Sequence, residues 1–370
     1  MTSMDLGVSV VIPTYNRAAI VGRAVESALV ATRPGDEILV VDDSSTDDTA
    51  TRIGQYGDRV RYLASRHVGP GAIRNLGIRE ARMPLVAFLD SDDVWMPDKL
   101  ELQRTVMQAR PDVLFCFTDF AHRTRRGIEI RRVLPQWHFD VREWDEILGP
   151  GCPFSSLGSL PAGRPDFLVH VGDLYFTEMQ GDYVCTSTVM VRRAEAGDAL
   201  RFAEDLRRFQ DWECFGRLAQ KGPAAYLDCE TQWNCDHGGS RLTGADELYC
   251  ETARIQILNR VWGSDPRFLA KHGQSYREVL ASHQRAKAKA LLALGRTKEA
   301  REEFLLAGGA SRAERMLTSL PGPLTRAIIA ARRRLRRQGS LEPVPAEAGR
   351  NARGDAALVA LALPRVRRSA

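Results

Sequence analysis

Apolar runs rich in β-branched residues alternate with segments of helical period along the first 120 residues. A strand buried on both faces needs apolar side chains at successive positions, which predicts strands at 8–13, 36–43, 59–64, 85–89 and 112–117. Between them, apolar residues recur every three or four positions, which predicts helices over 18–31, 72–81 and 96–109. A further helix is expected over 45–55, where Ser45 or Thr46 is a plausible N-cap. Strands that alternate with helices form βαβ units, so we expect an α/β fold around a parallel sheet.

The rest of the chain is organised differently. Residues 121–180 are irregular and rich in Arg, Pro, Gly and Trp, which indicates a variable, loop-bearing insertion. The pattern then predicts a strand at 185–193, a helix at 208–222 and a strand at 224–228. From about residue 246 it is helical, and 286–307 resembles a single helix pair of tetratricopeptide type. We therefore predict an α/β domain over 1–245, a helical extension over 246–338 and a disordered tail over 339–370.

Polar residues cluster where three of the predicted strands end, at 13–17, 42–48 and 90–93. Ligands of open α/β sheets bind beyond the carboxyl ends of the strands, so these clusters are expected to face one crevice. The last cluster holds Asp90, Asp92 and Asp93, whose like charges repel each other. A divalent cation would relieve that repulsion, and Mg²⁺ or Mn²⁺ bound to a nucleotide diphosphate suits such oxygen ligands. The alternative is that these acids only cap the helix that starts near Pro97.

Cysteine usage and charge indicate the cellular compartment and the character of the C-terminal segment. The seven cysteines are scattered without a CxxC pair, and no secretory leader is evident, so we expect reduced thiols and a cytoplasmic protein. The net charge is +5, yet the chain from Pro323 onward holds eleven arginines and three acids. This segment is thus strongly basic, while the remainder of the chain is mildly acidic.

Four motifs occur in order with short spacers: VSVVIPTYNR, EILVVDDSSTDDT, GPGAIRNLGI and VAFLDSDD. In this order they resemble the family 2 glycosyltransferases, which are inverting, nucleotide-sugar-dependent enzymes of GT-A fold. The resemblance covers residues 7–120 and 182–243. It implies a Rossmann-like mixed sheet flanked by helices, to which this chain adds an all-helical C-terminal extension.

The resemblance also implies roles for individual residues. Asp43 matches the residue that accepts a hydrogen bond from the base, Tyr15 can pack against a flat ring, and Arg74 matches a basic residue near the nucleotide. Asp92 matches a metal ligand, and Asp90 is expected to face the sugar or ribose. The nucleotide-binding residues expected from these matches are Pro13, Thr14, Tyr15, Arg17, Asp43, Arg74 and Asp90. His237, which lies where many relatives carry a histidine, is a second metal ligand or a diphosphate contact, unless it is structural.

An inverting transferase needs a base that takes the proton from the acceptor hydroxyl. Asp211 matches the family pattern of Asp, then an aromatic residue, at the start of a helix, and we assign it as the base. Asp211 is also a residue that the helix dipole alone would favour at this position. The family's usual Glu before this Asp is Gln210 here, and the competing acid pair is Glu204 and Asp205.

The expected activity is transfer of a sugar from a UDP- or dTDP-sugar, with Mg²⁺ or Mn²⁺, to a hydroxyl of a glycan, polysaccharide or glycolipid of the cell envelope. Two rival readings are a catalytically inactive scaffold of a glycan pathway and a nucleotidyltransferase. A nucleotidyltransferase would need a Gly-rich signature with Arg and Lys near the first strand. The segment IPTYNRAAIV lacks this signature. The basic segment 324–337 predicts peripheral contact with the inner face of a membrane. A solvated tail is its alternative, and the lack of aromatic residues there argues against nucleic acid as a partner.

Overall fold

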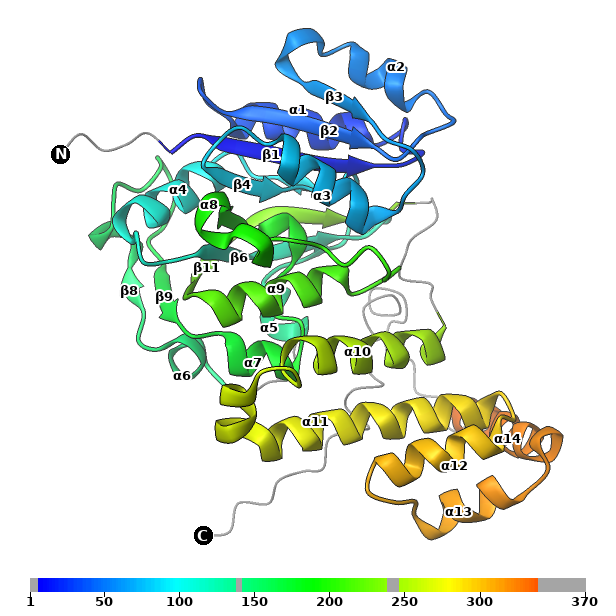
Figure 1. Ribbon diagram of the computed structural model, residues 1–370. Coiled ribbons are helices and arrows are strands. Elements are labelled where there is room, and N and C mark those ends of the chain that lie inside the picture. The colour runs from blue at the N-terminus through cyan, green and yellow to red at the C-terminus, as the bar shows by residue number, and fades with distance from the viewer. Residues whose placement is uncertain (1–5, 138–141, 238–245, 339–370) are drawn as a thin grey trace. The chain divides into compact units, whose positions relative to one another are not determined.

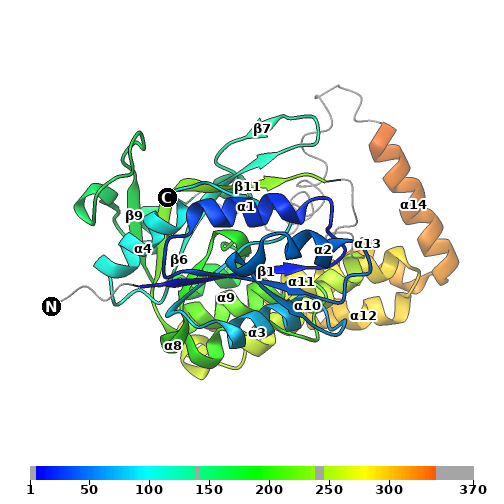
Figure 2. The ribbon, with the colours of Figure 1, turned by 90° about the horizontal axis from the view of Figure 1, so that it is seen from above.

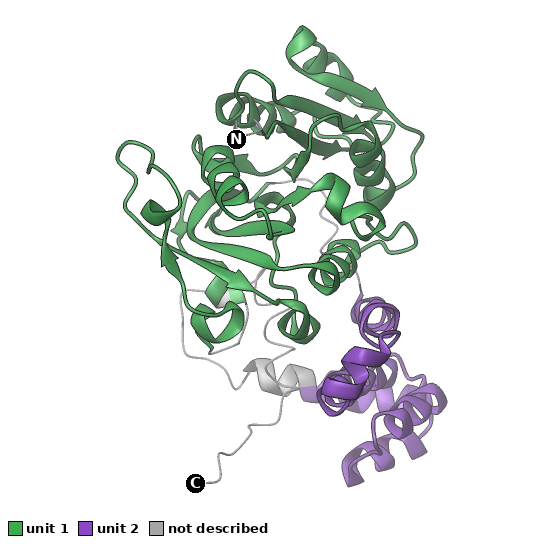
Figure 3. Ribbon diagram, turned by 60° about the vertical axis from the view of Figure 1, so that its left-hand side comes forward, with its two compact units in different colours: residues 1–240 green, residues 241–370 purple. Residues whose placement is uncertain are grey.

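The computed structural model describes residues 6–137, 142–237 and 246–338. The chain divides into two compact units, residues 1–240 and 241–370 (Figure 3). The predicted disordered tail, residues 339–370, lies outside the described residues.

The described strands of the first unit form one mixed sheet (Figure 1). Its N-terminal half is parallel and runs in the order β3-β2-β1-β4, as the βαβ pattern predicts. These strands are β1 (Val8–Thr14), β2 (Glu37–Asp42), β3 (Arg61–Ala64) and β4 (Leu85–Phe88). Their ends bring the three polar clusters to one edge of the sheet.

The second half of the sheet is not simply parallel. Strand β10 (Met190–Arg192) lies between β4 and β6 (Phe115–Arg123) and is antiparallel to both, whereas β11 (Ala224–Cys235) is parallel to β6. The short strands β5 (Val94–Trp95) and β7 (Glu129–Ile130) pair with β11 and β6. The mixed sheet implied by the family resemblance is therefore the one observed.

Alternate residues of the strands pack against helices on opposite faces. On one face, residues such as Val10 and Val40 join a core with α1 (Val21–Ala31), α2 (Thr49–Gly54) and α4 (Lys99–Ala109). On the other face lie α3 (Pro70–Glu80) and α9 (Gln210–Lys221), and Figure 2 shows α1 and α3 on opposite sides of β1. Helix α3 packs close to the sheet at Gly77, which has no side chain. A Cβ at this position would lie only 2.3 Å from Cγ1 of Val11.

Residues 121–180 contribute to the sheet although their pattern is irregular. Strand β9 (Leu168–Gly172) pairs with β11, and β8 (Cys152–Pro153) pairs with β9 at the edge. The described part of this segment includes the α-helices α5 (Leu134–Trp137), α6 (Trp144–Leu148) and α7 (Tyr175–Gln180). Trp144 stacks on Tyr226 of β11 at 3.8 Å between ring centroids, which ties the segment to the sheet. Helix α8 (Arg193–Ala196) follows β10.

A fully buried lysine lies at the centre of the first unit. Lys99 Nζ donates to Gln103 Oε1 and to the carbonyl of Thr188, at 3.2 Å from the latter, and lies 4.6 Å from the centre of the Trp95 ring. Burial lowers the pKa of Lys99 to about 7. Thr188 ends the short helix η3 (Thr186–Thr188) that leads into β10, so this lysine holds the entry to the central strand.

The second unit is all-helical in its described part, as predicted. It comprises α10 (Glu247–Val261), α11 (Pro266–Ala293), α12 (Thr297–Leu306), α13 (Arg312–Ser319) and α14 (Gly322–Gln338). Its apolar core is centred on Leu291, Leu292 and Phe304, from α11 and α12. Ser311 and Glu314 form a capping box that starts α13. Throughout the described residues of the chain, every helix is too short or too polar to span a membrane.

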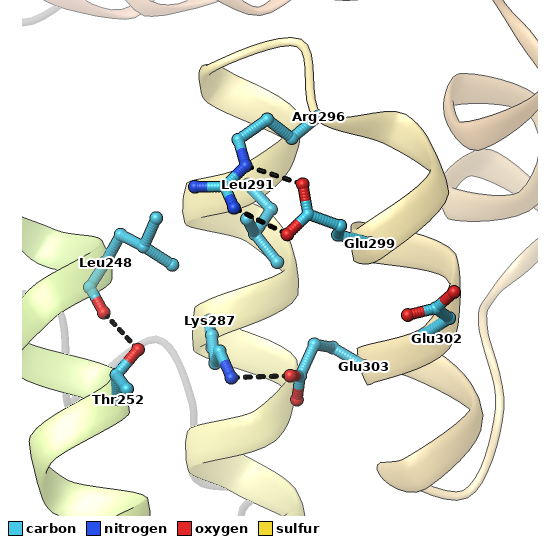
Figure 4. A pocket seen from close by; sticks show the side chains of 8 residues that line it. All are labelled: Leu248, Thr252, Lys287, Leu291, Arg296, Glu299, Glu302 and Glu303. Carbon is cyan, nitrogen blue, oxygen red and sulfur yellow. Dashed lines mark hydrogen bonds and ion pairs between the residues drawn. The ribbon is translucent and has the colours of Figure 1, made fainter.

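A pocket of about 320 Å³ lies among α10, α11 and α12 (Figure 4). Its walls carry ion pairs between Lys287 and Glu303, 2.6 Å apart, and between Arg296 and Glu299. Leu248 and Leu291 add a small apolar patch. Because these charges are largely satisfied within the pocket, it lacks the convergent unpaired groups of a typical ligand site.

Candidate functional site

The loops after β1 and β2 interlock at the edge of the sheet. The main-chain N–H of Asn16 donates to Ser45 Oγ at 2.8 Å, and Asn16 Oδ1 accepts from the N–H of Thr46 at 2.8 Å. Asn16 and Ser44 both have left-handed backbone conformations, with φ of 50° and 68°. The first two polar clusters therefore face each other, as their positions at adjacent strand ends predict.

Asp43 is buried and holds the loop that precedes α3. Its carboxylate accepts from the main-chain N–H groups of Val68 at 2.8 Å and Gly69 at 3.0 Å, and it lies 3.2 Å from Nδ1 of His67. The ring of His67 lies 4.6 Å from that of Tyr15, which is 43% exposed. Among the described residues, Oδ1 accepts only from Val68 and can take a further hydrogen bond, so Asp43 combines a structural role with spare capacity to accept from a ligand.

The other residues of the first polar cluster that are expected to bind the nucleotide are Pro13, Thr14 and Arg17. Pro13 and Thr14 belong to β1, and the carbonyl of Thr14 accepts from the N–H of Asp43 at 2.9 Å. The main-chain N–H of Arg17 donates to Thr49 Oγ1 at 3.0 Å. In this stretch the exposed aromatic surface thus comes from Tyr15, while Pro13 and Thr14 supply the backbone that positions it.

Carboxylates from two separate segments of the chain act on the guanidinium of Arg74. Its Nη2 donates to Asp90 Oδ1 at 2.5 Å. Burial would lower the pKa of Arg74, but the charges of Asp90, Asp211 and Asp92 together raise it. Burial raises the pKa of Asp90, helped by the charges of Asp92 and Asp211 and opposed by Arg74. The structure therefore brings together four of the predicted site residues.

His237 completes this group from the end of β11. Its Nε2 lies 2.8 Å from Asp92 Oδ2, and its ring is only 4% exposed, whereas the Asp92 side chain is 28% exposed. Next to them, Asn234 Nδ2 donates to Asp93 Oδ1 at 3.1 Å. Across the described ranges, His, Cys, Asp and Glu side chains are nowhere grouped in threes in a way that could hold a metal ion. A cation here would have Asp92 and His237 as protein ligands, and it would need further oxygen ligands from a substrate.

Asp211 lies in the first turn of α9, and its Oδ2 accepts from Thr186 Oγ1 at 3.1 Å. The competing pair is placed differently: Glu204 and Asp205 are exposed, and Glu204 Oε1 accepts from Asn75 Nδ2 at 2.9 Å. Gln210 is buried. The charge of Asp211 is among those that raise the pKa of Arg74.

The sequence reasoning missed two groups of residues behind Asp211. Glu178 of α7 is fully buried, and burial, then the charges of Asp182 and Asp211, raise its pKa well above the ordinary value. Its carbonyl accepts from the indole Nε1 of Trp212 at 2.7 Å. The hydroxyl-bearing residues of η3 are the second group. Neither Glu178 nor the residues of η3 belong to a recognisable motif. Their partners lie far away in the sequence, so no local pattern marks them.

The N-terminal part of the chain is similar in sequence to known glycosyltransferases. The family model described as glycosyl transferase family 2 matches residues 9–156. An uncharacterized glycosyltransferase of Rickettsia felis is 41% identical over 131 residues, which cover 35% of this chain and 22% of that protein. The Escherichia coli UDP-Glc:alpha-D-GlcNAc-diphosphoundecaprenol beta-1,3-glucosyltransferase WfgD is 31% identical over 134 residues, or 36% of this chain and 53% of WfgD. This chain thus spans at most about half the length of these relatives.

Among solved structures, Staphylococcus aureus TarS 1–349 in complex with UDP-GlcNAc matches with a TM-score of 0.53 at 16% identity, covering 87% of this chain and 88% of that chain. The mixed sheet flanked by helices is a GT-A fold. Residues 9–156 of this chain are therefore similar to glycosyl transferase family 2.

Proposed function

We propose that the protein is an inverting, metal-dependent glycosyltransferase that uses a UDP- or dTDP-sugar. The acceptor would be a hydroxyl of a glycan, polysaccharide or glycolipid of the cell envelope. One observation carries the proposal: Arg74 pairs with Asp90 at 2.5 Å at the carboxyl edge of the sheet, and the charges of Asp92 and of the distant Asp211 act on the same guanidinium. The donor class is supported by the family 2 match of residues 9–156, by the UDP-Glc in the name of WfgD and by the UDP-GlcNAc bound in the TarS complex.

The residues present fit a divalent cation, because Asp92 is partly exposed and His237 lies beside it. Mg²⁺ or Mn²⁺ bound by one or two such side chains fills its remaining positions with water and substrate phosphates. When bound, the ion would act as a Lewis acid toward the departing diphosphate. Asp90 and Arg74 form a fixed pair at the same edge, which suits contact with the sugar or ribose.

In the proposed reaction, Asp211 takes the proton from the acceptor hydroxyl. The hydroxyl oxygen forms the new bond to the anomeric carbon, and the bond from that carbon to the diphosphate oxygen breaks. The leaving diphosphate carries away the electron pair, and the configuration at the anomeric carbon inverts. Tyr15 and Asp43 would contact the base, and a carboxylate suits the ring N–H of uracil or thymine.

Replacing Asp92 with Asn should remove most metal-dependent nucleotide binding, because an amide oxygen without charge is a poor ligand for a hard cation. Isothermal titration of UDP in the presence of Mn²⁺ measures the effect. Asp112→Asn is the matched control, since Asp112 is 54% exposed and pairs with Arg110 away from this cluster. An unchanged UDP–Mn²⁺ affinity in the Asp92 variant would show that Asp92 is not a ligand.

Replacing Asp211 with Asn should lower turnover by about 10²- to 10⁴-fold, the usual contribution of general-base catalysis. Affinity for the donor nucleotide should hardly change, because the base contacts the acceptor. Asp205→Asn, at an exposed position six residues upstream, is the control and should retain turnover. Kinetics with full activity in the Asp211 variant and none in the Asp205 variant would assign the base to the earlier acid pair.

Replacing Asp43 with Ala should weaken binding of UDP about tenfold more than binding of inorganic pyrophosphate. A lost hydrogen bond to a charged group changes the binding free energy by about 1.5–3 kcal/mol, which is tenfold or more. Calorimetry on both ligands with Mn²⁺ separates base recognition from loosening of residues 67–69, since loosening alone would weaken both ligands equally. Asp48→Ala, an exposed acid of the same run whose side chain makes no cap, serves as the control.

The C-terminal helix is the proposed site of peripheral membrane contact. Thr325 is buried and Ile329 packs on the core of the second unit, whereas Leu324, Ile328, Arg326 and Arg332 are exposed. An exposed face with both apolar and basic side chains suits an anionic lipid surface.

The double variant Arg326→Gln, Arg332→Gln tests this contact without disturbing the packed face. Each Arg near an anionic surface contributes about 1 kcal/mol, so binding to phosphatidylserine vesicles should fall by roughly 30-fold. Arg267→Gln, Arg277→Gln removes the same charge from exposed positions of α11 and is the control. Equal vesicle co-sedimentation of both double variants and the parent chain would refute a role for α14.

A further inference from the structure

The short helix η3 (Thr186–Thr188) makes hydrogen bonds both to Asp211 on α9 and to the acidic segment that follows β4. Thr186 Oγ1 donates to Asp211 Oδ2 at 3.1 Å. Ser187 Oγ donates to Asp93 Oδ2 at 2.6 Å and accepts from the main-chain N–H of Asp90 at 3.0 Å. One turn of chain therefore connects the first turn of α9 to the acidic end of β4.

This turn is itself held on its other side. The indole Nε1 of Trp95 donates to the carbonyl of Ser187 at 2.8 Å, and Gln103 Nε2 donates to the carbonyl of Thr188 at 2.8 Å. Lys99 reaches the same Thr188 carbonyl at 3.2 Å. Thr186, Ser187 and Thr188 are all buried. The hydroxyl of Thr186 is thus presented to Asp211 from a fixed position rather than from a flexible loop.

We propose that Thr186 is a positioning residue for Asp211: its hydroxyl fixes one carboxylate oxygen and favours the ionised form that accepts a proton. Asp211 Oδ1 accepts from the main-chain N–H of Trp212 at 3.0 Å, so the two bonds together set the plane of the carboxylate. A hydrogen bond to a charged carboxylate favours that form over the neutral acid. The inference rests on the proposed function, in which Asp211 is the base.

Other charged groups also act on Asp211, and their effects must be separated from that of Thr186. Those in electrostatic contact with it come from α3, the end of β4, α7 and α9 itself: Arg74, Asp90, Glu178 and Cys214. Burial raises the pKa of the carboxyl of Glu178 well above its ordinary value and raises the pKa of the thiol of Cys214 to about 12. A substitution at Thr186 changes none of these groups, so it isolates the hydroxyl.

The test compares three variants in the full chain. Thr186→Val keeps the shape and removes the donor, Thr186→Ser keeps the donor, and Thr188→Val removes a hydroxyl that donates to the carbonyl of Cys185 in the same turn. Two quantities are measured against pH: turnover, and the ¹³C shift of the Asp211 carboxyl carbon, assigned by its absence in Asp211→Asn.

In Thr186→Val the ionised carboxylate loses a donor, so protonation sets in at higher pH. Its carboxyl signal and the acid limb of turnover should both move up by about half to one pH unit, with turnover at the plateau down by up to about tenfold. Thr186→Ser should recover most of the shift, and Thr188→Val should leave the signal in place. UDP–Mn²⁺ affinity, measured by calorimetry, should stay within about twofold in Thr186→Val.

Two results would overturn the inference, and they differ in what they say of the proposed function. An Asp211 signal that does not move in Thr186→Val, or moves equally in Thr188→Val, shows that the hydroxyl does not act on Asp211, while the base assignment still rests on Asp211→Asn. A moved signal with an unmoved acid limb shows that Thr186 holds a carboxylate that is not the base. In that case the proposed mechanism fails together with the inference.

Discussion

Repulsion among Asp90, Asp92 and Asp211 is the constraint on which the rest of the first unit depends. Two like charges 4 Å apart repel by about 4 kcal/mol at the effective dielectric near a protein surface, and burial raises this figure. The chain tolerates the crowding because Arg74 pairs with Asp90, and because Asp211 is anchored on α9, apart from the segment after β4 that carries Asp90 and Asp92. A site that is strained in this way gains stability from any ligand that brings positive charge to it.

The sequence was enough to predict the first half of the sheet and the acids at its edge. Buried strands such as 85–88 are apolar throughout, and an abrupt change to Asp at residue 90 is visible without any knowledge of contacts. The helix that carries Asp211 was equally clear, because its apolar face repeats with helical period. These are local signals, and each lies within one element.

The residues that sequence reasoning missed act over long separations. Ser187 is 94 residues from Asp93, Thr186 is 25 from Asp211, and Lys99 is 89 from Thr188. Ser and Thr before a strand are common, and a lysine that starts a helix is normally exposed, so neither pattern predicts its buried partner. Strands β8 and β9 were missed for a related reason, since a short edge strand has few residues in which an alternation can show. The direction of β10, antiparallel within a parallel neighbourhood, likewise depends on pairing rather than on composition.

The order of the strands shows that the segment matched by the family model is smaller than the sheet to which it belongs. The family match ends at residue 156, yet β10, which follows at residues 190–192, lies between β4 and β6, and β11 covers the other side of β6. A fragment cut at the end of the match would expose three unpaired strand edges at the centre of its own sheet, and such edges favour aggregation. The evolutionary signature and the cooperative folding unit therefore have different boundaries, and a chimera that exchanges only the matching region would interrupt the sheet through its middle.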